Sequence, residues 1–248
     1  MQLGLHGRRA LVTGASSGLG LACAQALAAE GATVVISSRS ADRLAAAAAT
    51  IDADVTSIVA DVSDPDAVAD LVASTNAVLG GIDILIANAG GPPPGKFADT
   101  PFERYEPALR QNLLSTVAMC QATVPAMRER GWGRVVAITS AAVREPNPLL
   151  ILSNTARAGL TGFLKTLARE VAADGVTVNS LQPGMHATER LTSIYGDDLS
   201  RVTASVPART LGEPGDFGRF AAFLCSDSAK FVTGTAIPID GGAGHGLL

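Results

Sequence analysis

A glycine-rich segment near the start of the chain, 13–20, has the composition of a phosphate-binding turn. It reads Thr-Gly-Ala-Ser-Ser-Gly-Leu-Gly, between an apolar run and an alanine-rich helical pattern. Glycines permit a tight turn and a close approach to a ligand, and a helix starting there directs its N–H groups at a pyrophosphate. A glycine-rich turn can also be purely structural, but this context favours a dinucleotide site. The residues expected to contact the phosphates are Gly14, Ser16, Ser17, Gly18, Leu19 and Gly20.

The end of the second apolar run indicates which dinucleotide such a site would prefer. It reads Ser37-Ser38-Arg39 and contains no acidic side chain. A carboxylate here would accept a hydrogen bond from the ribose 2′-hydroxyl and disfavour a 2′-phosphate, whereas an arginine can pair with that phosphate. We therefore expect Ser38 and Arg39 to favour NADP over NAD. The alternative is a solvated arginine at a strand end.

Short β-branched runs and alanine-rich stretches predict the elements that position these residues. Strands are expected at 9–13, 33–37, 57–60, 82–87, 134–139, 176–181 and 235–239. Helices are expected at 21–30, 41–51, 65–79, 102–130, 153–173 and 215–225. Continuous apolar strands that alternate with helices are typical of a parallel sheet covered on both faces. Right-handed crossovers then give a doubly wound α/β sheet.

Composition excludes several classes of protein. The 248 residues suit one α/β domain, and 47% hydrophobic against 17% charged residues excludes a disordered chain. No apolar run approaches the roughly 20 residues of a membrane-spanning helix. The net charge of −4 offers no basic surface for nucleic acid or an anionic membrane. Three widely spaced cysteines fit neither a disulfide framework nor a zinc site, so we expect a cytoplasmic protein without a metal.

Five motifs, in order and spacing, resemble those of the short-chain dehydrogenase/reductase (SDR) superfamily over almost the whole chain. They are 13–20, Asp61-Val62, Asn88-Ala89-Gly90, Pro183-Gly184 and Asp240-Gly241-Gly242. The resemblance, in particular to 3-oxoacyl-ACP reductase-like members, implies a single NADP-binding Rossmann domain over 1–248. It also implies a mostly seven-stranded parallel sheet, with helices on both faces, and a substrate lid over 185–214.

The resemblance implies how further residues would bind the cofactor. Asp61-Val62 would flank the adenine, and Asn88-Ala89-Gly90 would stabilise the central sheet beside the ribose. Pro183-Gly184 would lie near the nicotinamide, with Thr188 on its amide.

The same resemblance implies a catalytic Asn, Ser, Tyr and Lys, and the chain departs from this set at the last two. Asn112 and Ser140 occupy the first two positions. The Tyr would follow Ser140 by about a dozen residues, where the chain has Ser153, and the Lys would stand at Arg157. Residues 141–164 contain no Tyr and no Lys, so no shift in alignment restores them.

Ser153 and Arg157 change the chemistry available. In the family, the Tyr transfers a proton at the reacting oxygen, while the Lys lowers the Tyr pKa and holds the ribose. A serine hydroxyl is shorter and a far weaker acid than a tyrosine, whose pKa is near 10. Arginine stays protonated and forms planar bidentate pairs. Arg157 shares a helix face with Ser153. Arg157 can therefore hold the ribose hydroxyls, or it can bind a carboxylate or phosphate of the substrate. Alternatively, the site is degenerate and Arg157 merely fills the Lys position.

Three ionisable side chains in the predicted pocket walls are alternative sources of a proton. His186 follows Gly184 closely and has an ordinary pKa suited to neutral pH, although a lone loop histidine is more often exposed. Tyr195 falls in the lid, where we do not expect a catalytic role. Glu145 is expected to be solvated or paired with the adjacent Arg144.

These observations favour an NADP(H)-dependent oxidoreductase with an atypical site formed by Asn112, Ser140, Ser153 and Arg157. It would reduce a carbonyl, or a related C=N or C=C bond, of a small and partly apolar substrate. The alternatives are a non-catalytic NADPH-binding sensor or scaffold, and a non-redox lyase or isomerase on the same fold. The resemblance also implies a homo-oligomer, dimer or tetramer, that pairs helices 102–130 and 153–173. No nucleic-acid or membrane partner is expected.

Overall fold

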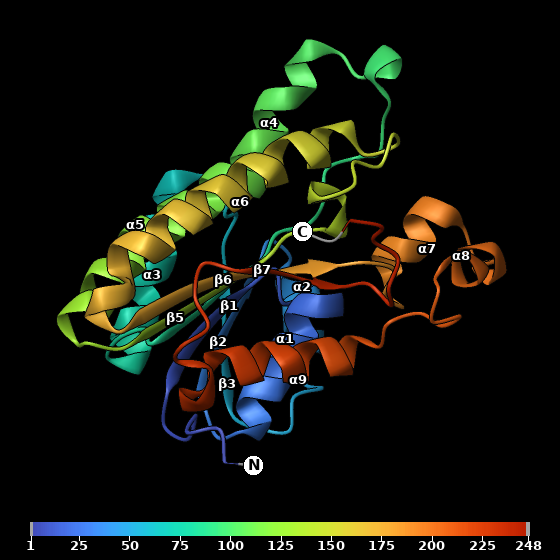
Figure 1. Ribbon diagram of the computed structural model, residues 1–248. Coiled ribbons are helices and arrows are strands. Elements are labelled where there is room, and N and C mark those ends of the chain that lie inside the picture. Colours follow the sequence, from blue (N-terminus) through green and yellow to red (C-terminus); the bar gives the residue numbers. More distant parts are fainter. Residues whose placement is uncertain (1, 247–248) are drawn as a thin grey trace.

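A seven-stranded parallel sheet forms the centre of the molecule in a computed structural model, which describes residues 2–246 (Figure 1). The strand order is β3-β2-β1-β4-β5-β6-β7. The strands are β1 (Arg9–Thr13), β2 (Thr33–Ser38), β3 (Val55–Val59), β4 (Ile84–Ala87), β5 (Gly133–Ile138), β6 (Val176–Pro183) and β7 (Ala236–Ile239). The order reverses between β1 and β4, which opens a crevice at their carboxyl ends. The predicted single-domain Rossmann fold is thereby confirmed.

Alternation along each strand gives the sheet two buried faces. In β1, Ala10 and Val12 join one core cluster, whereas Leu11 joins the other. In β4, Ile86 joins the first cluster and Leu85 the second. Successive side chains of a strand point to opposite faces, so a continuous apolar run fills both layers of core.

Helices cover both faces of the sheet (Figure 1). One layer contains α1 (Gly18–Ala29), α2 (Ala41–Ala48) and α9 (Pro214–Cys225), and the other contains α3 (Pro65–Leu79), α5 (Ser115–Glu129) and α6 (Ile151–Val171). Helices α1 and α9 approach so closely that a Cβ on Gly218 would collide with the carbonyl group of Ala22.

The helix predicted over 102–130 is a composite. A 3-10 turn, Phe102–Arg104, leads into α4 (Tyr105–Leu109), and a π-helical turn, Arg110–Leu114, joins α4 to α5. A π turn inserts an extra residue in the helical repeat and often occurs at functional sites. Here it contains the buried Asn112.

Several helix and strand boundaries differ from those predicted. Helix α1 starts at Gly18 rather than at residue 21, because the extended backbone of Ser17 ends the turn early. Strand β3 begins at Val55, two residues before the predicted start. The predicted lid, 185–214, contains two short helices, α7 (Glu189–Tyr195) and α8 (Ser200–Ser205).

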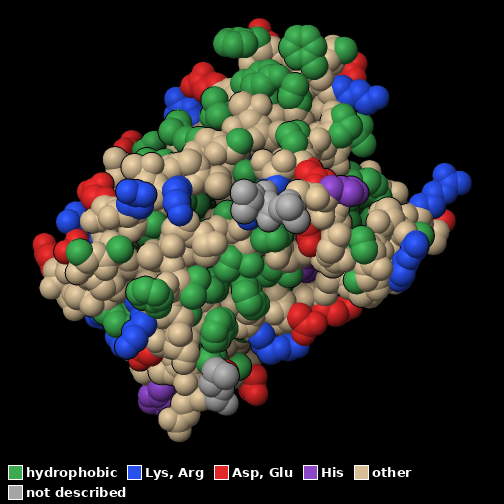
Figure 2. Space-filling view, in the orientation of Figure 1, with side chains coloured by type: hydrophobic (Ala, Val, Ile, Leu, Met, Phe, Trp, Pro, Cys, Tyr) green, Lys and Arg blue, Asp and Glu red, His purple; other side chains and the backbone are tan. Residues whose placement is uncertain are grey.

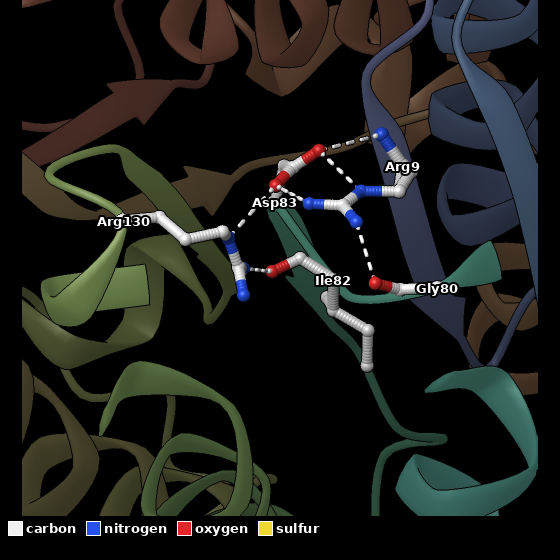
Figure 3. A network of polar contacts seen from close by, with 5 residues as sticks. All are labelled: Arg9, Gly80, Ile82, Asp83 and Arg130. Carbon is white, nitrogen blue, oxygen red and sulfur yellow. Dashed lines mark hydrogen bonds and ion pairs between the residues drawn. The ribbon is translucent and has the colours of Figure 1, made fainter. Parts of the chain in front are cut away.

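A network of charges ties together the amino ends of β1 and β4, at the edge of the sheet opposite the crevice (Figure 3). Arg9 donates from Nε and Nη2 to the Asp83 carboxylate at 2.8 and 2.6 Å, and from Nη1 to the Gly80 oxygen at 2.7 Å. Arg130, after α5, approaches Asp83 at 3.4 Å and donates to the Ile82 oxygen at 2.5 Å. Burial alone would raise the pKa of Asp83, but the hydrogen bonds from Arg9 and the charges of both arginines lower it.

The cysteines are free and buried, and burial raises the pKa of the Cys120 and Cys225 thiols to about 12. Between residues 2 and 246, no group of three or more His, Cys, Asp or Glu side chains is placed to hold a metal ion. None of the helices in this part of the chain has the length and apolar character required to cross a membrane.

Candidate functional site

A cleft of about 960 Å³ lies at the carboxyl ends of the strands, beside the crevice between β1 and β4. It brings together most of the residues predicted from the sequence. Those in its wall are Gly14, Ser16, Ser17, Gly18, Leu19, Ser38, Arg39, Asp61, Val62, Asn88, Ala89, Gly90, Ser140, Ser153, Arg157, Pro183, Gly184 and Thr188. Gly20 and Asn112 are outside this lining, but Gly20 packs against Gly14, and Asn112 Oδ1 accepts a hydrogen bond from Arg157.

The turn after β1 has the conformation that its glycines predict. Gly14 and Gly18 have φ of +58° and +56°, in the left-handed region that favours glycine. A Cβ on Gly14 would lie 2.8 Å from Asn88 Nδ2, and a Cβ on Gly20 would collide with the Gly14 carbonyl group. The first turn of α1 therefore lies directly behind the glycine turn, with free N–H groups suited to an anion.

Asn88 links the glycine turn to β4. Its Nδ2 donates to the Gly14 oxygen at 3.1 Å, and its backbone N–H donates to Thr13 Oγ1 at 3.0 Å. Thr13 in turn donates to the Asn88 oxygen at 2.8 Å. Across the turn, Thr188 faces Gly18, whose Cβ position would be 3.5 Å from Thr188 Cγ2. The chain thus places the start of the lid against the glycine turn.

One end of the cleft is cationic, at the carboxyl ends of β2 and β3. Arg39 lines it, and its charge lies close enough to Asp61 to affect that carboxylate. Burial alone would raise the pKa of Asp61, but two hydrogen bonds from Ser63 and the charge of Arg39 lower it. The Ser38 hydroxyl donates to the Ser40 oxygen at 3.4 Å, so its proton is directed along its own chain.

Sequence reasoning missed a second cation at this end, Arg43. It lines the cleft from α2, and its Nη2 lies 2.5 Å from Glu189 Oε2 at the start of α7. The ion pair spans the cleft between α2 and the lid. A basic residue three positions after the helix-capping Ser40 was the available signal.

Ser140 and Ser153 form the polar part of the other end. Ser140 follows β5, and its Oγ accepts a hydrogen bond from the Ala142 N–H at 3.1 Å. Ser153 lies in the first turn of α6 and is 8% exposed. Both line the same cleft.

Arg157, one turn beyond Ser153, is bound to the protein itself. Its Nη1 donates to the oxygens of Ile138 and Thr139 at 2.6 and 2.9 Å. Its Nη2 donates to Asn112 Oδ1 at 2.9 Å and lies 3.5 Å from the Ala89 oxygen. Burial, with a further contribution from the charge of Arg190, lowers the pKa of Arg157 to about 10, so the group stays protonated at neutral pH.

The three alternative proton donors have different surroundings. His186 is buried rather than exposed, because its ring meets Phe217 edge-on at 5.2 Å, and burial lowers its pKa. Tyr195 lines the cleft, and its Oη accepts a hydrogen bond from Asn147 Nδ2 at 3.5 Å.

Glu145 is exposed, as one of its two expected states requires, but the alternative expectation that it pairs with Arg144 is wrong. Glu145 instead binds His245 near the carboxyl end of the chain, with His245 Nδ1 2.9 Å from Glu145 Oε2. Arg144 donates to Gln182 Oε1 at 2.8 Å and to the Ala236 oxygen at 2.8 Å, which anchors it against the sheet. The segment after β7 therefore forms part of the cleft wall, a contact across 100 residues that no local pattern reveals.

Comparisons with known proteins agree with this geometry. Residues 14–244 match the family model described as "Enoyl-(Acyl carrier protein) reductase". The chain is 34% identical over 240 residues to 3-oxoacyl-(acyl-carrier-protein) reductase FabG from Escherichia coli (strain K12), covering 97% of this chain and 98% of the relative. It is 36% identical over 244 residues to human dehydrogenase/reductase SDR family member 4, covering 96% and 88%. The structure of L-sorbose reductase from Gluconobacter frateurii, complexed with NADPH and L-sorbose, superimposes with a TM-score of 0.93 at 32% identity, covering 100% of both chains.

Proposed function

The chain belongs to the short-chain dehydrogenase/reductase superfamily, and from this premise we propose that it is an NADP(H)-dependent oxidoreductase with an atypical active site. The reaction would be reduction of a carbonyl, or of a related C=N or C=C bond. One observation carries the proposal: the glycine turn, the cationic end and the two serines line one continuous cleft.

The residues of the cleft fit NADP. The Gly14 position leaves no room for a Cβ, and the amino end of α1 behind it suits a pyrophosphate. Arg39 and Arg43 would hold the 2′-phosphate, where a carboxylate would have repelled it. Asp61-Val62 would flank the adenine, and Thr188 would bind the nicotinamide amide. When bound, NADPH supplies the hydride.

The chain's own polar groups would orient the substrate. The hydroxyls of Ser140 and Ser153 can donate to a substrate oxygen, although neither is acidic enough to act as tyrosine does. Loss of a positioned acid costs about 10²–10⁴ in rate. Arg157 would hold Asn112 and the end of β5 in place, because its Nη donors are directed at protein oxygens. A substrate that needs little proton donation suits this arrangement.

Residues 185–214 would form a lid over the substrate. Their ends meet at one point, where Gly212 N–H donates to the Met185 oxygen at 2.8 Å and Ala187 N–H donates to the Gly212 oxygen at 2.9 Å. Leu191 and Ile194 of α7 line the cleft, as does Leu150 opposite them. These apolar walls support a small, partly apolar substrate.

A second candidate function, a non-catalytic NADPH sensor or scaffold, is favoured by the contacts of Arg157. Because both Nη atoms of Arg157 donate to protein oxygens, its guanidinium would keep the cofactor site rigid without taking part in a reaction. Fluorescence titration with NADPH, followed by absorbance assays of NADPH oxidation with a panel of ketones, imines and enones, separates the two. Tight binding with oxidation supports the reductase. Tight binding without oxidation supports the sensor, and no binding contradicts both.

The double variant Ser153→Tyr with Arg157→Lys tests the atypical site. If the rest of the cleft suits ordinary ketones, restoring the acid should raise kcat for a simple ketone by about 10²–10⁴-fold, the range expected of a positioned acid. The single variant Ser153→Tyr is the matched control, since it lacks the lysine that lowers the tyrosine pKa. No gain in the double variant would mean that the loops of the cleft also differ from those of ordinary reductases.

A further inference from the structure

Arg157 and Arg190, like Arg144 in the wall of the same cleft, have only neutral partners among the described hydrogen bonds and ion pairs. Those of Arg157 are backbone oxygens and the Asn112 amide. Arg190, from α7 of the lid, donates from Nη2 to the Pro92 oxygen at 2.6 Å. Both arginines line the same cleft.

The two guanidinium groups flank one short backbone segment, 89–92, just after β4. Arg157 Nη2 reaches the Ala89 oxygen from α6. Arg190 covers Gly91, where a Cβ would lie 3.1 Å from Nη2 and 3.4 Å from Cζ. The charge of Arg190 accordingly contributes to the lowered pKa of Arg157. Two like charges thus stand close together at the serine end of the cleft.

The carboxylates that line the cleft have partners of their own. Glu189 pairs with Arg43, and Glu145 pairs with His245. Asp240 accepts hydrogen bonds from the Gly242 and Gly244 N–H groups, both at 3.0 Å. Asp61 is bound by Ser63 and lies near Arg39, at the far end. Among the described residues, none of these four carboxylates forms an ion pair with Arg157 or Arg190.

We propose that the substrate carries a carboxylate, which binds Arg190 in the field of the buried Arg157. This inference rests on the proposed function and specifies its substrate class. The phosphates of NADP would lie at the glycine turn and at Arg39, so they leave this charge unmatched. Arg190 can contact the anion because only Nη2 donates to the Pro92 oxygen, and Nε and Nη1 take no part in that hydrogen bond. Arg157 would act through its charge, because its Nη donors are already engaged.

A matched pair of ligands tests the proposal: 2-oxooctanoate and its methyl ester, which share an apolar tail and a ketone. We would titrate each by calorimetry into protein saturated with NADP⁺, a complex that cannot transfer hydride to a ketone. The wild-type protein should bind the carboxylate at least tenfold more tightly than the ester. Arg190→Gln should weaken carboxylate binding roughly 10- to 100-fold, as loss of a hydrogen bond between charged groups predicts, and should leave ester binding within about twofold. Arg190→Lys should restore part of the difference.

Arg201→Gln is the matched control, because Arg201 is an exposed arginine of α8 in the same lid. Equal affinities of the wild-type protein for the two ligands, undetectable binding of both, or equal effects of Arg190→Gln and Arg201→Gln on carboxylate binding would overturn the proposal. If the protein fails to bind NADP⁺, the proposed function fails separately. The same ligand pair titrated into the free protein would still show whether Arg190 selects the anion.

Discussion

The charge of Arg157 and its hydrogen bonds have different roles in the structure. A lysine ammonium at this position could turn its three donors toward a ribose. The planar guanidinium instead reaches back to the oxygens of β5 and to Asn112, where it joins α6 to the π-helical turn. The charge stays in the cleft wall while most of the donors point into the protein.

Arg39 and Arg43 give a prediction about cofactor choice. Arg39→Ala should weaken NADP binding by roughly 10- to 100-fold, because a charge-assisted bond to the 2′-phosphate is lost. NAD binding should change by less than about threefold, since NAD lacks that phosphate. Fluorescence titration with both reduced cofactors measures the ratio.

Arg43→Ala distinguishes the two arginines, because it also breaks the ion pair with Glu189. It should lower NADP affinity while loosening the start of the lid. Glu189→Gln is its control, since that change frees Arg43 and should leave NADP binding intact or tighter. An unchanged NADP-to-NAD ratio in Arg39→Ala would contradict the assignment of the 2′-phosphate site.

At the residue scale, a local motif was sufficient to find the glycine turn, because that turn follows a strand that ends at a fixed edge of a parallel sheet. Ser140 and Ser153 were placed by the resemblance to the family, and Ser153 lies in the first turn of α6 rather than at a strand end. Arg43 and Arg190 were missed because their partners, Glu189 and Pro92, are distant in sequence, 146 and 98 residues away. A contact of that kind depends on how the lid lies over the sheet, so it cannot be predicted from the spacing of residues along the chain.

Among the elements, β1 and β4 depend on a partly buried charge at their amino ends. Asp83, whose side chain is 8% exposed, accepts from Arg9 and approaches Arg130 (Figure 3). Because folding lowers the Asp83 pKa, this network contributes stability above the unfolded pKa near 3.9. The contribution is lost as the pH falls through the lower folded-state value.

Asp83→Asn should therefore lower the free energy of unfolding by about 1–3 kcal/mol at pH 7. The difference from wild type should shrink as the pH falls below about 4, because the carboxylate of the unfolded wild-type chain becomes protonated there, while the native carboxylate becomes protonated only at its lower folded-state pKa. Urea unfolding at pH 7 and at pH 3 measures both. Asp70→Asn, an exposed change on α3, should have little effect at either pH. A constant difference between Asp83→Asn and wild type at both pH values would rule out the ionic contribution.

The sequence predicted the strands better than it predicted the lid. Strands β1 and β5 bury nearly every residue, and such runs are detectable without their neighbours. Helices α7 and α8 have only 7 and 6 residues, too few for a helical repeat to stand out from loop composition. The π turn at Arg110–Leu114 lies inside a helical pattern and has no signature of its own.

For the whole molecule, we propose a homo-oligomer that pairs α5 and α6 with those of a second copy. The exposed positions of α6 include Thr155, Ala158, Gly162 and Thr166, which share one face through their spacing. Small side chains there would let a second helix approach closely. At the end of the molecule around α4, hydrophobic side chains gather at the surface (Figure 2), and Phe97 and Phe102 in this region are 81% and 85% exposed.

Gly162→Lys tests this pairing. A Cβ on Gly162 meets nothing within 4 Å inside the chain, so the variant should fold normally. In a paired α6 the new ammonium would be buried, which should raise the dimer dissociation constant by at least about tenfold. Sedimentation velocity measures the change, with Ala45→Lys on the exposed side of α2 as the control. A wild-type protein that sediments as a monomer, or identical behaviour of the two variants, would refute the pairing.

The charged network and the cleft lie at opposite ends of the same strand. Asp83 precedes β4 and Asn88 follows it, a separation on the order of 17 Å along an extended chain. Substitutions that far apart, with no shared partner, usually have additive free energies. A protein engineer can therefore treat the two edges as independent variables. Substitutions at the amino edge of the sheet can be selected for thermostability, and substitutions at the carboxyl edge for substrate preference, without either set changing the effect of the other.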